Sequence, residues 1–233
     1  MISINNMTSG GFGNRLLYYN NLRQLAEREG ETWSCVPWDG FQFFKGDMLN
    51  GSQRANQILN LCLGEKFFEW SSTSTRSIFD LKVKPKVEEN SVAIHFRGTD
   101  FFQWNSDAVL GEDYYLNAID EVSSETFYIF TDDEELTSYK TVVEYLKKKS
   151  KNIKFGMNTS DRTNYIQDFS TMSECDYIIS SPSTYCICAG FIGKKKKIIH
   201  CKTWVDDRVN KEDKFWVDLN DGGNEDYSLW RLI

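Results

Sequence analysis

Polar residue types that can do chemistry gather directly behind an apolar run in the middle of the chain. Val92–Ile94 has the continuous apolar character of a buried parallel strand. His95, Arg97, Thr99 and Asp100 follow it and supply a titratable ring, a permanent cation, a hydroxyl and a carboxylate. Because ligands of open α/β sheets bind beyond the carboxyl ends of the strands, we expect the functional site here.

Each of these residues admits more than one role. The forked guanidinium of Arg97 matches phosphate oxygens, which favours a contact to a diphosphate over a surface ion pair. His95 is equally well explained as a ligand contact or as a hydrogen-bonded histidine of the core. Asp100 is a candidate general base, a clamp on Arg97, or the cap of the next turn.

The carboxylates Asp132 and Asp133 come directly after a second apolar strand. Thr131 with Glu134 three residues later has the spacing of a capping box that opens a helix. A compatible interpretation makes the carboxylates acceptors for a nucleotide base or ribose. A third, ranked below both, is a divalent metal site, since hard cations prefer carboxylate ligands.

Two further stretches have the character of anion-binding turns. Ser180–Thr184 ends a strand and opens a helix, where hydroxyls and free N–H groups can hold an anion; an ordinary helix cap is the alternative. Residues 9–15 form a glycine-rich loop between an alternating strand over residues 1–4 and a helix. The glycine spacing matches neither common phosphate-binding fingerprint, so a tight structural turn remains as good an explanation.

The elements that must position these residues alternate between strand and helix. In the first part we expect strands over residues 1–4 and 32–38, a helix after the glycine loop, an aromatic loop over 39–50 and a helix over 53–63. The expected later strands are 92–96, 127–130, 152–155, 177–179 and 197–200, and the expected helices between them are 113–122, 133–149, 162–174 and 184–192. Such alternation predicts βαβ units and a parallel sheet.

The charged, proline-containing segment 82–86 is the predicted linker. It divides the chain into an N-terminal α/β domain over 1–86, a Rossmann-like domain over 87–201, and a tail over 202–233 that we expect to fold back on the first domain.

Composition limits the class of partner. The formal charge of −7 among 233 residues argues against a nucleic-acid-binding protein. We expect no transmembrane segment, because no apolar run approaches bilayer length. We expect no signal peptide, because residues 1–4 are not a basic region followed by an apolar core. Six irregularly spaced cysteines fit neither a disulfide framework nor a zinc site, which predicts a cytoplasmic protein.

Taken in order, four motifs resemble those of the GDP-fucose-dependent fucosyltransferases, the superfamily of α-1,2-, α-1,6- and protein O-fucosyltransferases. Residues 10–16 (GGFGNRL) look like their opening glycine loop, and residues 95–100 (HFRGTD) are similar to their His-x-Arg-x-Gly-Asp element. Residues 130–134 (FTDDE) resemble their Phe-Ser/Thr-Asp block. Residues 168–179 (DFSTMSECDYII), with Ser181–Thr184 behind them, resemble their final segment.

The resemblance implies a GT-B fold, with two Rossmann-like domains facing across a cleft and the first one reduced. It implies an inverting, metal-independent glycosyltransferase with no cofactor, which moves fucose from a nucleotide donor to a glycan acceptor. Arg97 would bind the β-phosphate, and Asp100 is the candidate base. The donor-binding set would be His95, Arg97, Thr99, Asp132, Asp133, Asp168, Ser181, Ser183, Thr184, Gly11, Gly13 and Asn14.

Two positions depart from the family pattern. Gly98 stands where many relatives have a second arginine, and Arg15 stands where they have glutamine. The departures leave the donor sugar open, so a transferase that uses a UDP-sugar such as UDP-xylose or UDP-rhamnose is one alternative. A separate alternative is a non-catalytic α/β module that binds a nucleotide or carbohydrate.

Overall fold

A computed structural model describes residues 1–8, 10–46, 57–58, 78–104, 106–157, 164–193, 196–201 and 230–232. The chain divides into two compact units, whose boundary falls between Val83 and Lys84. This boundary lies inside the charged segment 82–86, whose backbone is neither helix nor strand.

The first unit is built on a small parallel sheet. Its elements are β1 (Ile2–Ile4), α1 (Phe12–Glu29), β2 (Trp33–Cys35), α2 (Gly40–Phe43) and β3 (Gln57–Ile58). The strand order is β2-β1-β3, and both neighbours of β1 run parallel to it. α1 ends at Gly30, whose φ of 63° is left-handed and therefore favours glycine.

The helix predicted over residues 53–63 is wrong at the two positions that can be checked. Gln57 and Ile58 form strand β3, and the other residues of that segment lie outside the described ones. The pairing of β3 with β1 explains the error, because a partner distant in sequence overrides local periodicity. The aromatic loop that follows β2 contains the four-residue helix α2, and its Phe44 is fully buried.

The second unit contains the larger sheet. Its elements are β4 (Val92–Phe96), α4 (Phe101–Trp104), the 3-10 helix η1 (Ser106–Ala108), α5 (Glu112–Asp120), β5 (Thr126–Thr131), α6 (Thr137–Lys148), β6 (Asn152–Phe155), α7 (Tyr165–Glu174), β7 (Tyr177–Ile179), α8 (Thr184–Ile192), β8 (Lys197–His200) and β9 (Trp230–Leu232). The parallel, Rossmann-like α/β sheet expected from the alternating pattern is confirmed.

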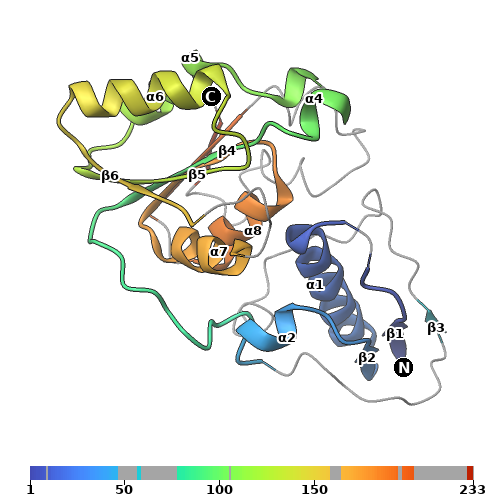
Figure 1. The fold of residues 1–233 in the computed structure, drawn as a ribbon. Coiled ribbons are helices and arrows are strands. Elements are labelled where there is room, and N and C mark those ends of the chain that lie inside the picture. Colours follow the sequence, from blue (N-terminus) through green and yellow to red (C-terminus); the bar gives the residue numbers. More distant parts are fainter. Residues whose placement is uncertain are drawn as a thin grey trace. The chain divides into compact units, whose positions relative to one another are not determined.

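The strand order β6-β5-β4-β7-β8-β9 reverses direction once, between β4 and β7. From β4 the chain moves outward through β5 to β6, and then returns to the other side of β4. When every crossover is right-handed, helices that connect strands toward β6 lie on one face of the sheet, and helices that connect strands toward β9 lie on the other. Accordingly, α5 and α6 lie on one face, whereas α7 and α8 lie on the other (Figure 1).

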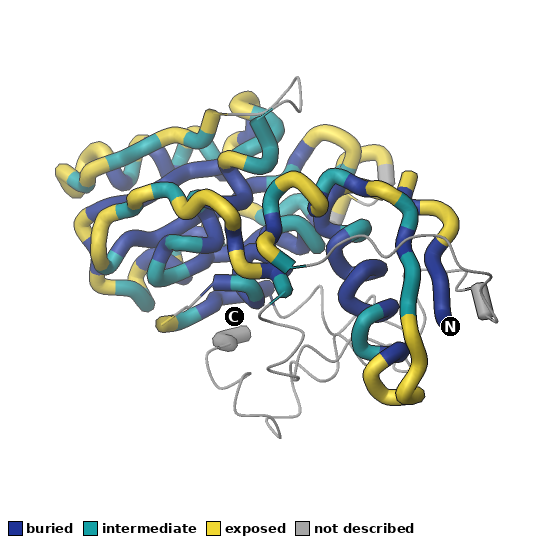
Figure 2. Tube along the Cα trace, turned by 90° about the horizontal axis from the view of Figure 1, so that it is seen from below, coloured by how far each residue is buried: buried dark blue, intermediate teal, exposed yellow. Residues whose placement is uncertain are grey.

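The core of the second unit surrounds its central strands. All five residues of β4 are buried, as are the first five of β5, whereas edge strand β6 has no buried residue. Figure 2 shows the same contrast between buried strands and exposed loops. Val92, Ile94 and Phe96 pack into one apolar cluster with residues of α5 and α6. The alternate residues of β4 therefore point to the opposite face.

The last strand was not among the predicted ones. β9 pairs in parallel with β8, so the described part of the 202–233 tail belongs to the sheet of the second unit. Residues 202–229, where we expected contacts with the first unit, lie outside the described residues. None of the described helices combines the length and apolar character needed to cross a bilayer.

Candidate functional site

The site is centred on the reversal point of the large sheet. His95 is the fourth residue of β4 and Arg97 directly follows that strand, whereas Ser180 and Ser181 directly follow β7. At the carboxyl edge of a parallel sheet, a crevice forms where the connections that follow two adjacent strands run to opposite faces of the sheet. The sequence placed the chemistry at strand ends, and the strand order adds that β4 and β7 are the two strands that flank this point.

His95 joins these two strands. Its Nδ1 lies 2.6 Å from Ser181 Oγ, and both side chains are buried. On the same face the ring lies 5.7 Å from that of Tyr185 in α8. Burial lowers the pKa of His95 to about 4. Of the two nearby charges, Asp132 raises this pKa and Arg97 lowers it. The imidazole is therefore neutral at pH 7.

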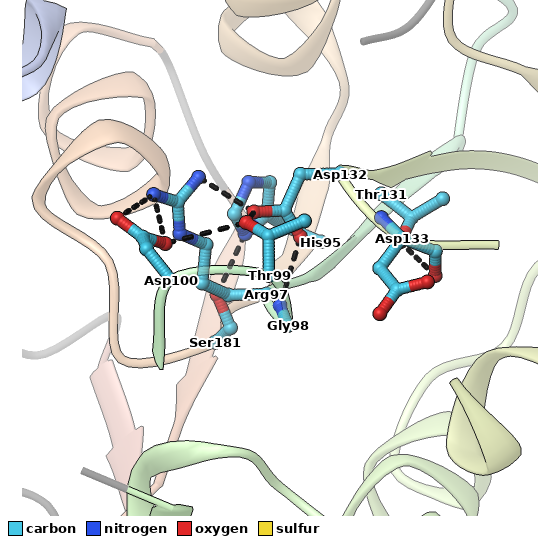
Figure 3. A network of polar contacts seen from close by, with 9 residues as sticks. All are labelled: His95, Arg97, Gly98, Thr99, Asp100, Thr131, Asp132, Asp133 and Ser181. Atoms are coloured by element: carbon cyan, nitrogen blue, oxygen red, sulfur yellow. Dashed lines mark hydrogen bonds and ion pairs between the residues drawn. The ribbon is translucent and has the colours of Figure 1, made fainter. Parts of the chain in front are cut away.

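Arg97 is held between two carboxylates (Figure 3). Its Nη1 lies 2.8 Å from Asp132 Oδ2, and its Nη2 lies 2.7 and 2.9 Å from the two oxygens of Asp100. Asp100 therefore clamps Arg97, and it also directly precedes α4, where its carbonyl accepts the N–H of Gln103 at 3.2 Å. The guanidinium also lies 5.2 Å from the ring centre of Phe101, a favourable cation–π distance.

Asp132 organises the turn behind β4. One of its oxygens accepts the backbone N–H of Gly98 at 2.8 Å, and the other accepts the Thr99 hydroxyl at 2.7 Å. With the Arg97 ion pair, this carboxylate binds three consecutive residues of the turn. The turn is thus held in place by the residue that directly follows the neighbouring strand β5, at the same edge of the sheet.

The backbone of Gly98 lies close to side chains of the turn after β5. A Cβ atom on Gly98 would lie 2.9 Å from Leu136 Cδ2 and 3.1 Å from Asp133 Cβ. Such distances require the neighbours to move. The second arginine of the family motif is thus absent at a position where the turn after β5 approaches the backbone closely.

The predicted capping box at Thr131 and Glu134 is wrong. α6 begins only at Thr137, and its first flanking residue is Leu136. The Thr131 hydroxyl instead accepts the N–H of Asp133 at 3.0 Å and donates to its carbonyl at 2.9 Å. Thr131 therefore stabilises a tight turn within residues 131–136 that ends beside Gly98, and the helix starts after that turn.

Ser183 and Thr184 lie at the beginning of α8. Ser183 is the N-cap residue with an extended backbone, and its side chain makes no capping hydrogen bond. Its carbonyl accepts the N–H of Ile187 at 3.0 Å as the first bond of the helix. The helix starts at Thr184, three residues after Ser181, so its positive end lies on the side of the sheet that carries His95.

Asp168 lies at a separate position along the same edge of the sheet. It is 7% exposed and accepts the N–H of Met157, just beyond β6, at 2.8 Å. A Cβ on Gly156 would lie 2.7 Å from the Phe130 ring and 3.0 Å from Asp168 Oδ2, so the strand end, ring and carboxylate pack tightly.

The predicted residues of the glycine loop belong to the first unit. Gly11 is the N-cap of α1, and Gly13 lies in its first turn. Gly10 has a φ of 73°, and the side chain of Asn14 lies over it so closely that a Cβ would be 2.5 Å from Asn14 Nδ2. Arg15 pairs with Asp39 at 2.6 Å and donates to the Gly10 carbonyl at 3.2 Å, which ties the loop down.

Sequence reasoning missed three residues that shape the cluster. Phe101 contacts Arg97, Tyr185 packs beside His95, and the Tyr115 hydroxyl donates to the His95 carbonyl at 3.3 Å. Phe101 follows the polar motif directly, so its position was the available signal. The two tyrosines come from helices on opposite faces, and no local pattern indicates them.

Among the described residues, no group of three or more His, Cys, Asp or Glu side chains is arranged to hold a metal ion. Asp132 and Asp133 point into different turns (Figure 3). No protein-family model matches the sequence, and a search of curated proteins returns no significant match.

Proposed function

We propose that the chain is an inverting, metal-independent glycosyltransferase that takes its sugar from a nucleotide diphosphate donor, with GDP-fucose as the first candidate. The observation that carries the proposal is the position of Arg97 at the reversal point of a parallel sheet. There a forked cation lies just behind one strand, and a helix N-terminus lies just behind its neighbour. Both features suit a diphosphate.

The proposed chemistry uses these groups on the leaving side of the reaction. An acceptor hydroxyl attacks the anomeric carbon as the carbon–oxygen bond to the diphosphate breaks, and the nucleoside diphosphate leaves with the electron pair. Arg97 and the first N–H groups of α8 stabilise the negative charge that develops on the leaving phosphate. Asp100 accepts the proton of the attacking hydroxyl as general base.

The remaining parts of the site have supporting roles. Neutral His95, with its Nδ1 engaged by Ser181, offers Nε2 as an uncharged hydrogen-bonding partner of the donor. Asp168 and the adjacent apolar residues Phe155 and Met157, both 53% exposed, suit a nucleotide base. The proposal includes the GT-B arrangement, in which the glycine loop at Gly11, Gly13 and Asn14 approaches the sugar and acceptor.

Gly98 leaves the identity of the donor open. It stands where many fucosyltransferases have a second arginine, so the turn departs from the motif on which the GDP-fucose assignment rests. A UDP-sugar, which carries the same diphosphate, is therefore the second candidate.

A thermal-shift screen against GDP, UDP and their sugars tests these assignments. A ligand at a hundred times its dissociation constant adds about 2.7 kcal/mol of stability, which raises Tm by roughly 5–10 °C for a chain of this size. Stabilisation by GDP compounds supports GDP-fucose as the donor, whereas stabilisation by UDP compounds supports a UDP-sugar instead. No response to any nucleotide would contradict the proposal.

A transfer assay separates an enzyme from a binding module. We expect the chain to release nucleoside diphosphate from the donor sugar that stabilises it, with unchanged activity in EDTA. Binding without turnover across a panel of glycan acceptors would favour a non-catalytic nucleotide-binding module, and loss of activity in EDTA would indicate a metal-dependent transferase.

A further inference from the structure

The two carboxylates on Arg97 differ in how firmly they are held. Asp132 is 18% exposed and also binds the backbone of Gly98 and the hydroxyl of Thr99. Asp100 is 54% exposed, and its described side-chain partners are Arg97 and the Thr99 hydroxyl at 3.3 Å. An exposed ion pair contributes little stability, so Asp100 can separate from Arg97 at small cost.

The contact made by Asp100 is the contact expected of a phosphate. Both of its oxygens approach Nη2 of Arg97, at 2.7 and 2.9 Å, and carboxylate and phosphate oxygens use the same guanidinium donors. Two carboxylates around one guanidinium also leave the cluster with a formal charge of −1. A diphosphate that approaches while Asp100 stays in place meets a like charge.

The guanidinium is held in position independently of Asp100. Asp132 fixes Nη1 at 2.8 Å, and the Phe101 ring lies 5.2 Å from the guanidinium carbon. Removal of the Asp100 carboxylate therefore leaves an Arg97 with its orientation kept and Nη2 open to solvent.

We propose that Asp100 is an internal, exchangeable counter-ion, which occupies the place on Arg97 that the diphosphate of the ligand takes, while Asp132 keeps Arg97 in position. The proposal rests on the phosphate site of the proposed function. Displaced by the diphosphate, the Asp100 carboxylate no longer pairs with Arg97. Because an inverting attack comes from the face of the sugar opposite the leaving group, the general-base role requires this carboxylate to move to that face. Asp100 thus opposes ligand binding for as long as it pairs with Arg97.

Titration calorimetry with inorganic pyrophosphate at low salt tests the opposing roles of the two carboxylates. Asp100→Asn removes the competing charge and is expected to bind pyrophosphate about three- to tenfold more tightly than the unmodified chain. Asp132→Asn loosens Arg97 and is expected to bind about tenfold more weakly. Glu134→Gln, which makes the same change in net charge in the turn after β5, is the matched control and should stay within about twofold.

The decisive variant is Asp100→Asn, because an exposed residue can be replaced without loss of the fold; circular dichroism checks all three variants. Equal or weaker pyrophosphate binding by Asp100→Asn would overturn the proposal. An equal gain in Glu134→Gln would do so as well, since the effect would then be one of net charge. Absence of pyrophosphate binding at millimolar concentration in every form also overturns it.

Donor turnover distinguishes this proposal from the proposed function. If Asp100→Asn binds pyrophosphate more tightly and transfers sugar more slowly, both stand. If the unmodified chain turns over no nucleotide sugar and Asp100→Asn still binds pyrophosphate more tightly, the exchange of counter-ion stands and the transferase assignment falls.

Discussion

Arg15 in the first unit and Arg97 in the second show how similar exposure can accompany different roles. Each follows the first strand of its own parallel sheet, and their side chains are 20% and 24% exposed. Arg15 pairs with Asp39, itself only 19% exposed, and with the carbonyl of Gly10. Arg97 has one partner of that kind, Asp132, and a second, Asp100, that is more than half exposed.

The difference teaches that the exposure of an arginine says less about ligand binding than the exposure of its counter-ions. A guanidinium whose described partners are half-buried is committed to structure. A guanidinium with one well-exposed carboxylate can exchange that partner for a ligand. The following predictions test whether the two arginines differ in this way.

The largest effect is expected from Arg97→Ala. Loss of the cation that faces the leaving diphosphate should lower kcat by about 10²- to 10³-fold, measured as release of nucleoside diphosphate from the donor. Arg15→Ala is the matched variant in the first unit. It should lower the free energy of unfolding in urea by about 1 kcal/mol and reduce kcat far less. Equal losses of turnover in both variants would remove the distinction.

A smaller effect is expected from Gly98→Ser, which probes the close approach behind Arg97. The added side chain meets Leu136 and Asp133, so we expect a loss of about 1–3 kcal/mol in the free energy of unfolding. Gly111→Ser places the same group at the N-cap of α5, where a Cβ has no neighbour within 4 Å. That control should be neutral or slightly stabilising, and similar losses in both would contradict the steric explanation.

A further expected effect is a dependence of stability on pH that comes from two buried histidines. Burial lowers the pKa of His95 to about 4 and that of His200 to about 3, from an ordinary value near 6.5. Between those values the unfolded chain binds more protons than the folded one, so stability falls as pH drops from about 6.5 toward 4. The expected slope is at most about 1.4 kcal/mol per pH unit for each histidine.

Urea unfolding at several pH values checks this slope, and His95→Asn should reduce it. Because carboxylates also contribute to acid sensitivity, the comparison is the difference between the variant and the unmodified chain over pH 4–6.5. An unchanged slope in His95→Asn would show that His95 does not titrate in this way.

Local sequence patterns predicted much of the large sheet. The strands Val92–Phe96, Asn152–Phe155, Tyr177–Ile179 and Lys197–His200, and the helix Thr184–Ile192, have the predicted bounds. Each is a short run bounded by polar or turn-forming residues, so its first and last residues can be predicted from adjacent sequence positions.

The errors come from interactions between distant segments. Strand β3 and the late start of α6 at Thr137 depend on pairing and on the turn beside Gly98, respectively. Strand order likewise depends on pairing, so sequence reasoning placed the site at strand ends without the reversal between β4 and β7. The polar residues of the site could be predicted from their residue types. The ion pair between Arg97 and Asp132 could not, because it depends on how the strands pair.

The serines behind β7 have a practical consequence for spectroscopy. Ser181 contacts Nδ1 of His95, Ser180 contacts Nδ1 of His200, and the chain has 2 histidines in all. In an NMR spectrum of the imidazole groups, the His95 signals therefore report on Ser181 and the His200 signals report on the adjacent Ser180. A ligand at Arg97 should change the chemical shifts of His95 and leave those of His200 nearly unchanged. The His200 signals therefore serve as an internal reference in the same spectrum.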